Sequence, residues 1–244
     1  MQKNVEKMSI NYSPNFNLRK RSVSKVKYLI FHYTGMKSEN AAIKKLTNNN
    51  SGVSCHYFVK RNGNIVKIVP DLYIAWHAGN SSWKKDKLLN SNSIGIEISN
   101  PGHEHGYSKF SLNQIKSVIS LSKKLKKKYK IKKENILGHS DIAPLRKKDP
   151  GEKFPWKLLY ENKICIWHNL TEQRCKKLRG IKLNDSKKIY KLLFKFGYKS
   201  TNKQNEKIKI YKNFQRRFRP QIISSIVDQE SYAILKSLIK LNKK

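Results

Sequence analysis

The chain has 244 residues, with 53 Lys and Arg against 16 Asp and Glu, which gives a formal net charge of +37. Hydrophobic residues make up 38%. Globular proteins average about 45–50%, but here the apolar residues are spread along the whole chain, which argues against wholesale disorder. No apolar run reaches the ~18 residues that a membrane span requires, and the N-terminus shows no secretory signal, so we expect a cytoplasmic protein.

The strong positive charge is typical of proteins that meet polyanions, namely nucleic acid, anionic lipid or an anionic wall polymer. The sequence contains no zinc finger, basic zipper or RNA-binding aromatic motif, so we expect no specific nucleic-acid partner. Lys, Asn and Ile are abundant together, and the alternative is that drift in an AT-rich genome produced the charge. Three cysteines without a CxxC pair argue against a disulfide framework and predict reduced, partly buried thiols.

The first two thirds of the chain alternate between strand and helix patterns. An apolar run predicts a buried strand, and an Asn-Gly pair between two further strands predicts a tight hairpin turn. In chain order we expect a strand at Tyr28–Tyr33, a short helix at Ala41–Leu46 capped by Ser38, strands at His56–Val59 and Ile65–Val69, and a strand at Ser93–Ser99.

A long helix follows from Ser111 to about Tyr129, and Ser111 with Gln114 fits a capping box. After it come a short strand at Ile136–Gly138, a loop over 139–156 and a last short helix after Pro155. Together these elements predict an α/β fold with a central mixed sheet flanked by helices. The buried stripe of the long helix is predicted to contain Leu112, Ile115, Val118, Ile119 and Leu125.

The pattern changes at about Thr171 to three short amphipathic helices, which predict a small all-α domain. One spans about Asp185–Phe196, one carries Tyr211, Phe214 and Phe218, and one starts at Asp228. We therefore divide the chain into a basic N-terminal arm (1–24), a catalytic domain (25–168) and a three-helix domain (169–244).

Two histidines end buried strands, and an aspartate lies ten residues after the second. Side chains at adjacent strand ends can meet at the rim of a sheet, and two imidazoles with one carboxylate form a typical catalytic zinc site. His32, His139 and Asp149 are therefore candidate metal ligands. The alternative is that backbone carbonyls satisfy the two histidines at the strand ends.

Glu97 lies between isoleucines in the strand SIGIEIS. If it faces inward, burial raises its pKa and suits it to general-base work; otherwise it is a solvent-facing residue on an edge strand. Lys147 lies two residues before Asp149, so on an extended loop its ammonium would point toward the same site and could stabilise an oxyanion. The alternative interpretation is that Lys147 is an ordinary surface lysine.

Five motifs in order, over about residues 25–165, resemble the zinc-dependent N-acetylmuramoyl-L-alanine amidases of the amidase type 2 family, in the subgroup with an Asp as third ligand. That family also includes peptidoglycan recognition proteins. The motifs are FHYT (31–34), CHYFV (55–59), AWHAG (75–79), SIGIEISN (93–100) and GHSDIAPLRKKDPGEKFPW (138–156).

The resemblance implies a fold, a cofactor and residue roles. His32, His139 and Asp149 would bind Zn²⁺, Glu97 would be the catalytic acid/base, and Lys147 would stabilise the oxyanion. Peptidoglycan fragments or anhydro-muropeptides would be the substrates. The remaining candidates would contact substrate: His77 in the groove, Trp76 and Trp83 by stacking, and His56 near the site.

The C-terminal segment is similar to a three-helix peptidoglycan-binding module, although the usual small residues between helices are sparse. The alternative is a helical appendage that packs on the enzyme. Two other functions remain open, a muropeptide sensor without catalysis and a wall-lysing endolysin-type amidase. The latter would act in the periplasm or cell wall, whereas recycling of anhydro-muropeptides would take place in the cytoplasm.

Overall fold

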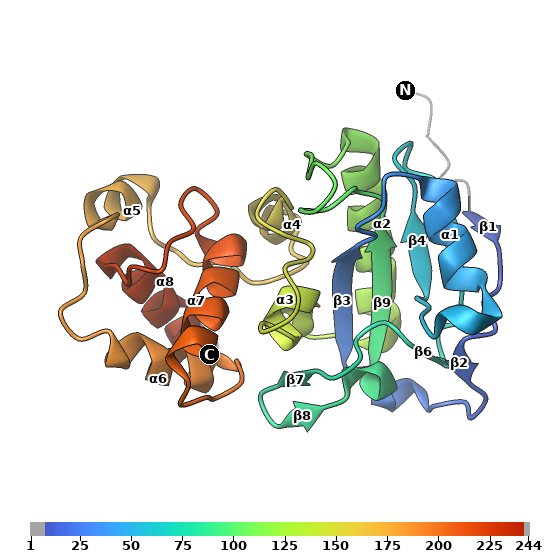
Figure 1. The fold of residues 1–244 in the computed structure, drawn as a ribbon, viewed down its shortest axis with the longest axis horizontal. Coiled ribbons are helices and arrows are strands. Elements are labelled where there is room, and N and C mark those ends of the chain that lie inside the picture. The colour runs from blue at the N-terminus through green and yellow to red at the C-terminus, as the bar shows by residue number, and fades with distance from the viewer. Residues whose placement is uncertain (1–7, 242–244) are drawn as a thin grey trace.

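The five expected strands and one unexpected strand, β1, assemble into one six-stranded sheet, in the order β1-β5-β4-β9-β3-β10. Figure 1 shows β3, β9 and β4 side by side in this sheet. Neighbouring strands are parallel except for β4 and β5, which form the antiparallel hairpin that the Asn-Gly pair predicts. The mixed sheet is therefore confirmed. The computed structural model describes residues 8–241, and the six strands are β1 (Met8–Ile10), β3 (Tyr28–Tyr33), β4 (Tyr57–Val59), β5 (Ile65–Lys67), β9 (Ser93–Ile98) and β10 (Ile136–Gly138).

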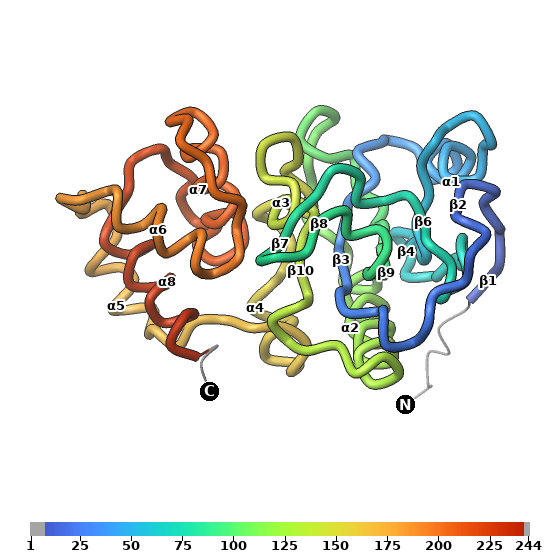
Figure 2. Tube along the Cα trace, turned by 90° about the horizontal axis from the view of Figure 1, so that it is seen from below, coloured from blue at the N-terminus to red at the C-terminus, as the bar shows by residue number. Residues whose placement is uncertain are grey.

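Helices cover both faces of this sheet, because alternate residues of each strand point to opposite sides. Phe58 and Val66 pack with one helix, α1 (Glu39–Thr47), whereas Tyr57 and Ile65 join the larger core that contains α2 (Leu112–Tyr129). Figure 2 shows the sheet between these two helices. The side chains of α1 and α2 thus cover the two faces of the sheet.

The start of α2 forms as its sequence predicts. The Ser111 hydroxyl accepts a hydrogen bond from the backbone N–H of Gln114, whose side chain accepts one from the N–H of Ser111, so the capping box is confirmed. Leu112 was predicted in the buried stripe, and this is wrong, since its side chain is 79% exposed. It is the first helical residue and points away from the sheet, whereas Ile115 and Val118 are buried.

The described part of the N-terminal arm adds strands to the structure. Strand β1 pairs in parallel with β5, and a short β2 (Phe16–Asn17) pairs with β6 (Ile74–Ala75). Arg21 is buried and donates to the carbonyls of Asp71 and Asn90. The part of the arm before residue 8 lies outside the described residues.

The segment after β10 contains more structure than the predicted loop. It begins with a single turn of helix, α3 (His139–Ile142), and continues to α4 (Trp156–Glu161), the short helix expected after Pro155. A small hairpin of β7 (Ser82–Trp83) and β8 (Asp86–Lys87) lies beside α3. Sequence periodicity cannot identify α3, because one turn is too short to show a repeat.

The C-terminal domain is all-α, as predicted, but four helices rather than three lie in the described part of it. The additional helix is α5, whose N-cap Thr171 accepts a hydrogen bond from the N–H of Arg174. The domain lies at one end of the molecule, with α3 and α4 between it and the sheet (Figures 1 and 2). The four helices are α5 (Glu172–Leu178), α6 (Lys187–Phe196), α7 (Gln204–Phe218) and α8 (Gln229–Leu241).

A buried ion pair joins the two domains. Arg217 of α7 donates to the carboxylate of Asp141 in α3, and Tyr198 donates to the other oxygen of the same carboxylate at 2.7 Å. All three side chains are at most 2% exposed. Within residues 8–241, no helix has the length and apolar character that crossing a membrane requires.

Candidate metal centre

The register of three parallel strands brings the first two candidate ligands together. In β3 and β9, His32 pairs with Glu97, and in β10 Gly138 pairs with Phe31, so that His139 follows directly beside His32. The carboxyl ends of parallel strands lie at one edge of a sheet, which is where ligands bind in open α/β sheets. The predicted meeting of these side chains therefore follows from the pairing of their strands.

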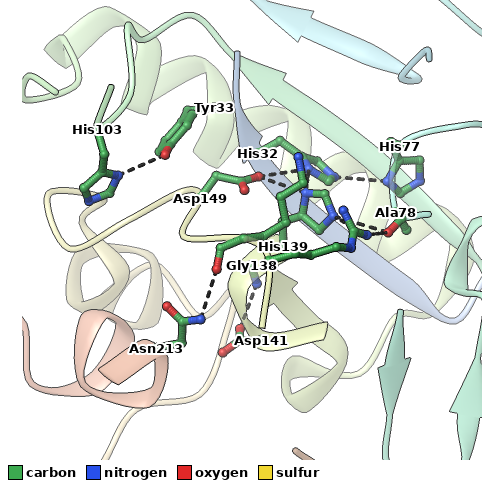
Figure 3. Close-up of polar contacts among 12 residues, drawn as sticks. His32, Tyr33, His77, Ala78, His103, Gly138, His139, Asp141, Asp149 and Asn213 are labelled. Carbon is green, nitrogen blue, oxygen red and sulfur yellow. Dashed lines mark hydrogen bonds and ion pairs between the residues drawn. The ribbon is translucent and has the colours of Figure 1, made fainter. Parts of the chain in front are cut away.

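Three ligand atoms converge at this edge (Figure 3). His32 Nδ1 lies 2.9 Å from His139 Nδ1 and 3.2 Å from Asp149 Oδ2, and His139 Nδ1 lies 3.1 Å from the same oxygen. All three residues are buried, with 1%, 4% and 5% exposure. Two imidazole nitrogens and one carboxylate oxygen at these separations could hold a single divalent cation and leave a fourth position open.

The second nitrogen of each ring already has a partner. His32 Nε2 lies 3.0 Å from His77 Nδ1, and His77 Nε2 lies 3.1 Å from the hydroxyl of Ser93. His139 Nε2 lies 3.3 Å from the carbonyl of Ala78. If each Nε2 carries the proton and donates it, the Nδ1 lone pairs of both ligands face each other, which is the arrangement found around protein-bound metals.

Burial and neighbouring charges determine the protonation states of His32 and Asp149. Burial and the neighbouring His139 lower the pKa of His32 to about 4, so its ring is neutral near pH 7. Burial alone would raise the pKa of Asp149, but the charge and hydrogen bonds of His139 and His32 outweigh it and place that pKa well below its usual range. The candidate ligand set therefore includes the neutral imidazole of His32 and the ionised carboxylate of Asp149.

Asp149 reaches this edge because the chain folds back against the start of α3. The carbonyl of Asp149 accepts a hydrogen bond from the N–H of Ser140 at 2.8 Å. Pro150 packs against Gly138, where an added Cβ would lie 2.7 Å from the proline ring. A larger residue than glycine before His139 would push the aspartate away from the two histidines.

Glu97 points from β9 toward the same cavity. Its Oε2 atom is buried and has no hydrogen-bond partner within the described residues. Burial, and then the charge of Asp149, raise the pKa of Glu97 well above its ordinary value, while Lys147 acts in the opposite direction. A carboxyl group with an elevated pKa and a free oxygen can accept and return a proton.

A cavity of about 410 Å³ lies over these residues. Trp76 and His77 line it, with Lys147 and Glu97, so four of the predicted site residues other than the ligands meet there. Trp76 is 36% exposed, whereas His77 is 9% exposed and its ring packs on Gly95. His77 thus supports the candidate ligand His32 through its Nδ1 atom.

Two of the predicted substrate contacts lie elsewhere. Trp83 is 1% exposed and packs edge-on against Tyr198 and Phe196 of the C-terminal domain. His56 is fully buried, and its Nδ1 accepts the backbone N–H of Gly95 at 3.0 Å. Neither residue lines the cavity, so the structure does not bring these two predicted contacts to it.

The rim of the cavity contains a polar network that sequence reasoning missed. The Tyr33 hydroxyl lies 2.9 Å from His103 Nδ1, and His103 Nε2 lies 3.1 Å from a carboxylate oxygen of Glu152. Arg216 of α7 lies 3.4 Å from the same carboxylate oxygen. Tyr33 directly follows the candidate ligand His32, and this position could have identified it from the sequence. No spacing in the sequence points to His103, Glu152 or Arg216.

The comparisons with known proteins agree with this geometry. The family described as N-acetylmuramoyl-L-alanine amidase matches residues 22–152, and this chain belongs to it. N-acetylmuramoyl-L-alanine amidase AmiD of Escherichia coli is 35% identical over 233 residues, covering 88% of this chain and 83% of the relative. The 1,6-anhydro-N-acetylmuramyl-L-alanine amidase AmpD of Haemophilus influenzae is 41% identical over 106 residues, 43% of this chain and 55% of AmpD.

Solved structures match over nearly the whole chain. The complex of E. coli AmiD with anhydro-N-acetylmuramic acid-L-Ala-D-γ-Glu-L-Lys superposes with a TM-score of 0.81 at 32% identity, covering 92% of this chain and 93% of AmiD. AmpDh3 of Pseudomonas aeruginosa gives 0.80 at 29% identity, with 95% and 98% coverage. At this coverage both alignments include most of the residues of the C-terminal helices.

Replacing His139 by alanine should abolish tight binding of a divalent cation, because two ligands do not form a closed site. Elemental analysis of the purified protein measures this directly. His105→Ala, at an exposed position, is the matched control and should retain metal like the unchanged protein. Stoichiometric metal in the His139→Ala protein would contradict the ligand assignment.

The raised pKa of Glu97, whose Oε2 atom is buried, predicts a pH-dependent stability difference in the metal-free protein. Its folded pKa lies above the ordinary 4.5, so the folded state retains a proton that the unfolded chain releases, and stability falls as pH rises through this interval. Glu97→Gln should therefore raise the melting temperature at pH 7.5 and lose this advantage near pH 4. The exposed Glu161→Gln should show no such pattern, and equal melting temperatures for Glu97→Gln and the unchanged protein at pH 7.5 would refute the raised pKa.

Proposed function

We propose that this protein is a zinc-dependent N-acetylmuramoyl-L-alanine amidase that hydrolyses the amide bond between the lactyl group of N-acetylmuramic acid and L-alanine. The observation that carries the proposal is the convergence of His32 Nδ1, His139 Nδ1 and Asp149 Oδ2 within 3.2 Å of one another. Membership of the amidase family supports the reaction type.

The ligand set fits zinc. The ion is usually four-coordinate, accepts imidazole nitrogen and carboxylate oxygen, and keeps one position open in catalytic sites. All three donors are buried, and each imidazole has a partner for its second nitrogen. When bound, zinc lowers the pKa of a water molecule and polarises the carbonyl of the amide.

Glu97 is the proposed acid/base. Its unpartnered oxygen can take the proton of the attacking water, and the same carboxyl can then give that proton to the departing alanine nitrogen. The raised pKa of Glu97 favours the second step, because a carboxyl group with a raised pKa holds more firmly the proton that it then donates. Lys147 lines the cavity and supplies a positive charge for the oxygen that becomes negative during attack.

The exposed ring of Trp76 is the proposed surface for the sugar or lactyl group. Its indole N–H donates to Asn17 at 2.7 Å, which holds the ring in place at the cavity wall. Aromatic faces bury a large area with few degrees of freedom, which suits a rigid sugar ring. His77 then acts through His32 and does not need to touch substrate.

A sensor without catalysis is the second candidate, and the residues weigh against it. Such a protein needs only the groove, yet here the three ligands, the buried carboxyl of Glu97 and the lysine of the same loop meet at one cavity. The charge of +37 is compatible with an anionic polymer, but it explains none of this convergence.

Mass spectrometry of the reaction products tests the proposal. Incubation with a muropeptide should release a free stem peptide and a sugar with free lactate, and a chelator should stop the reaction. Glu97→Gln should lower kcat by about 10²–10⁴-fold, in the range of a general acid–base group, while zinc content stays at one per chain. Near-normal turnover in this variant would contradict the role of Glu97.

We infer that soluble fragments with an anhydro sugar are the preferred substrates. The AmiD structure contains such a fragment, and AmpD is named for the anhydro sugar. In parallel assays, kcat/KM should be higher for anhydro-muropeptide than for the matched reduced-sugar fragment, and release from intact sacculi should be slower. Faster release from sacculi would favour the endolysin-type alternative. Action in the cytoplasm stays a prediction.

A further inference from the structure

We propose that Asn213, in the C-terminal domain, is a positioning residue for the catalytic loop, in a role that rests on the proposed function. The loop runs from the end of α3 to Asp149 and carries both Lys147 and a metal ligand. Asn213 lies on α7, more than sixty residues later in the chain, and is 2% exposed. Figure 3 shows its side chain directed at the backbone of this loop.

The side-chain amide of Asn213 binds two carbonyls of the loop at once. Its Nδ2 group donates to the carbonyl of Pro144 at 2.8 Å and to that of Lys147 at 3.0 Å. Its Oδ1 atom accepts a hydrogen bond from Arg216 at 2.8 Å. Both N–H donors and the acceptor are therefore used, and the orientation of the amide is determined by its partners.

These two bonds hold the backbone of the loop from α7, while the guanidinium of Arg146 in the same loop donates to the carbonyls of Ala78 and Asn80. At its start, the N–H groups of Arg146 and Lys147 donate to the carbonyl of Ala143. At its end, the carbonyl of Asp149 accepts from Ser140. Between these two points, Asn213 links α7 to the carbonyl of Lys147, which lies two residues before Asp149.

The helix that carries Asn213 is itself held against the metal centre. Arg217, one turn further along α7, donates to the carbonyl of Ile136 at 2.9 Å and to the carboxylate of Asp141. That carboxylate accepts the N–H of Gly138 at 2.8 Å, directly before the ligand His139. One face of α7 therefore determines the position of both segments that supply His139, Lys147 and Asp149.

This arrangement predicts a kinetic effect, not only a structural one. Displacement of a reacting group by about 1 Å can cost about 10²-fold in rate. If the loop is released, the ammonium of Lys147 and the carboxylate of Asp149 lose their fixed positions, whereas Trp76 and the rest of the cavity wall remain. We therefore expect kcat to change much more than KM.

The test uses Asn213→Asp in the full chain, which keeps size and shape but replaces the donor with a carboxylate that repels both carbonyls. Asn205→Asp is the matched control, since it adds the same charge to an exposed position of the same helix. We expect kcat to fall by about 10–100-fold, with KM within about threefold, and the affinity of the metal-free protein for Zn²⁺, measured by chelator competition, to weaken by about tenfold. The control should match the unchanged protein in both measurements.

A neutral variant covers the case in which Asn213→Asp does not fold. Asn213→Ser leaves room for water beside the two carbonyls and should show the same separation of kcat from KM. A lower melting temperature with unchanged kcat and Zn²⁺ affinity would overturn the proposal, as would failure of both variants to fold, because either result makes Asn213 purely structural. If the protein without substitutions shows no amidase activity, the proposed function is wrong. The Zn²⁺ affinity of the variants would then still test the positioning role of Asn213.

Discussion

The register of the parallel strands β3, β9 and β10 is the constraint on which the site depends. It places His32 opposite Glu97 and brings His139 to the same edge, although these residues are far apart in sequence. A shift of one residue in any of these pairings would turn the side chain to the other face of the sheet. The isoleucines that alternate with Glu97 hold the register, because they must stay in the core.

Much of the fold could be predicted from local patterns. The strand at Tyr28–Tyr33 and the capping box at Ser111 depend on neighbouring residues alone, and both formed as expected. β1 escaped prediction because pairing with β5 stabilises it, while its own residues are exposed. The single turn α3 escaped it because four residues show no period.

The candidate site likewise contains residues that the sequence could identify and residues that it could not. The candidate metal ligands lie in recognisable motifs, whereas the residues that position them are identified only by tertiary contacts. His77 and Trp76 lie in the same motif. The indole ring of Trp76 forms part of the cavity wall, whereas the ring of His77 lies behind His32. Trp83 looked like a second stacking surface, but the C-terminal helices cover it, and only the structure shows that cover.

The buried pair of Arg217 and Asp141 joins the C-terminal domain to the metal centre. Removing one partner of such a pair leaves an uncompensated buried charge and costs about 3–5 kcal/mol. Here the same carboxylate also caps the helical turn that begins with His139. The helical domain is therefore part of the support of the candidate site.

The central claim is that one zinc ion binds where the three ligand atoms meet. Anomalous diffraction at the zinc edge, from crystals of the zinc-loaded protein, tests it most directly. The account predicts a single strong peak at about 2.0–2.2 Å from His32 Nδ1, His139 Nδ1 and Asp149 Oδ2. A peak at other residues, with these three side chains unliganded, would contradict it.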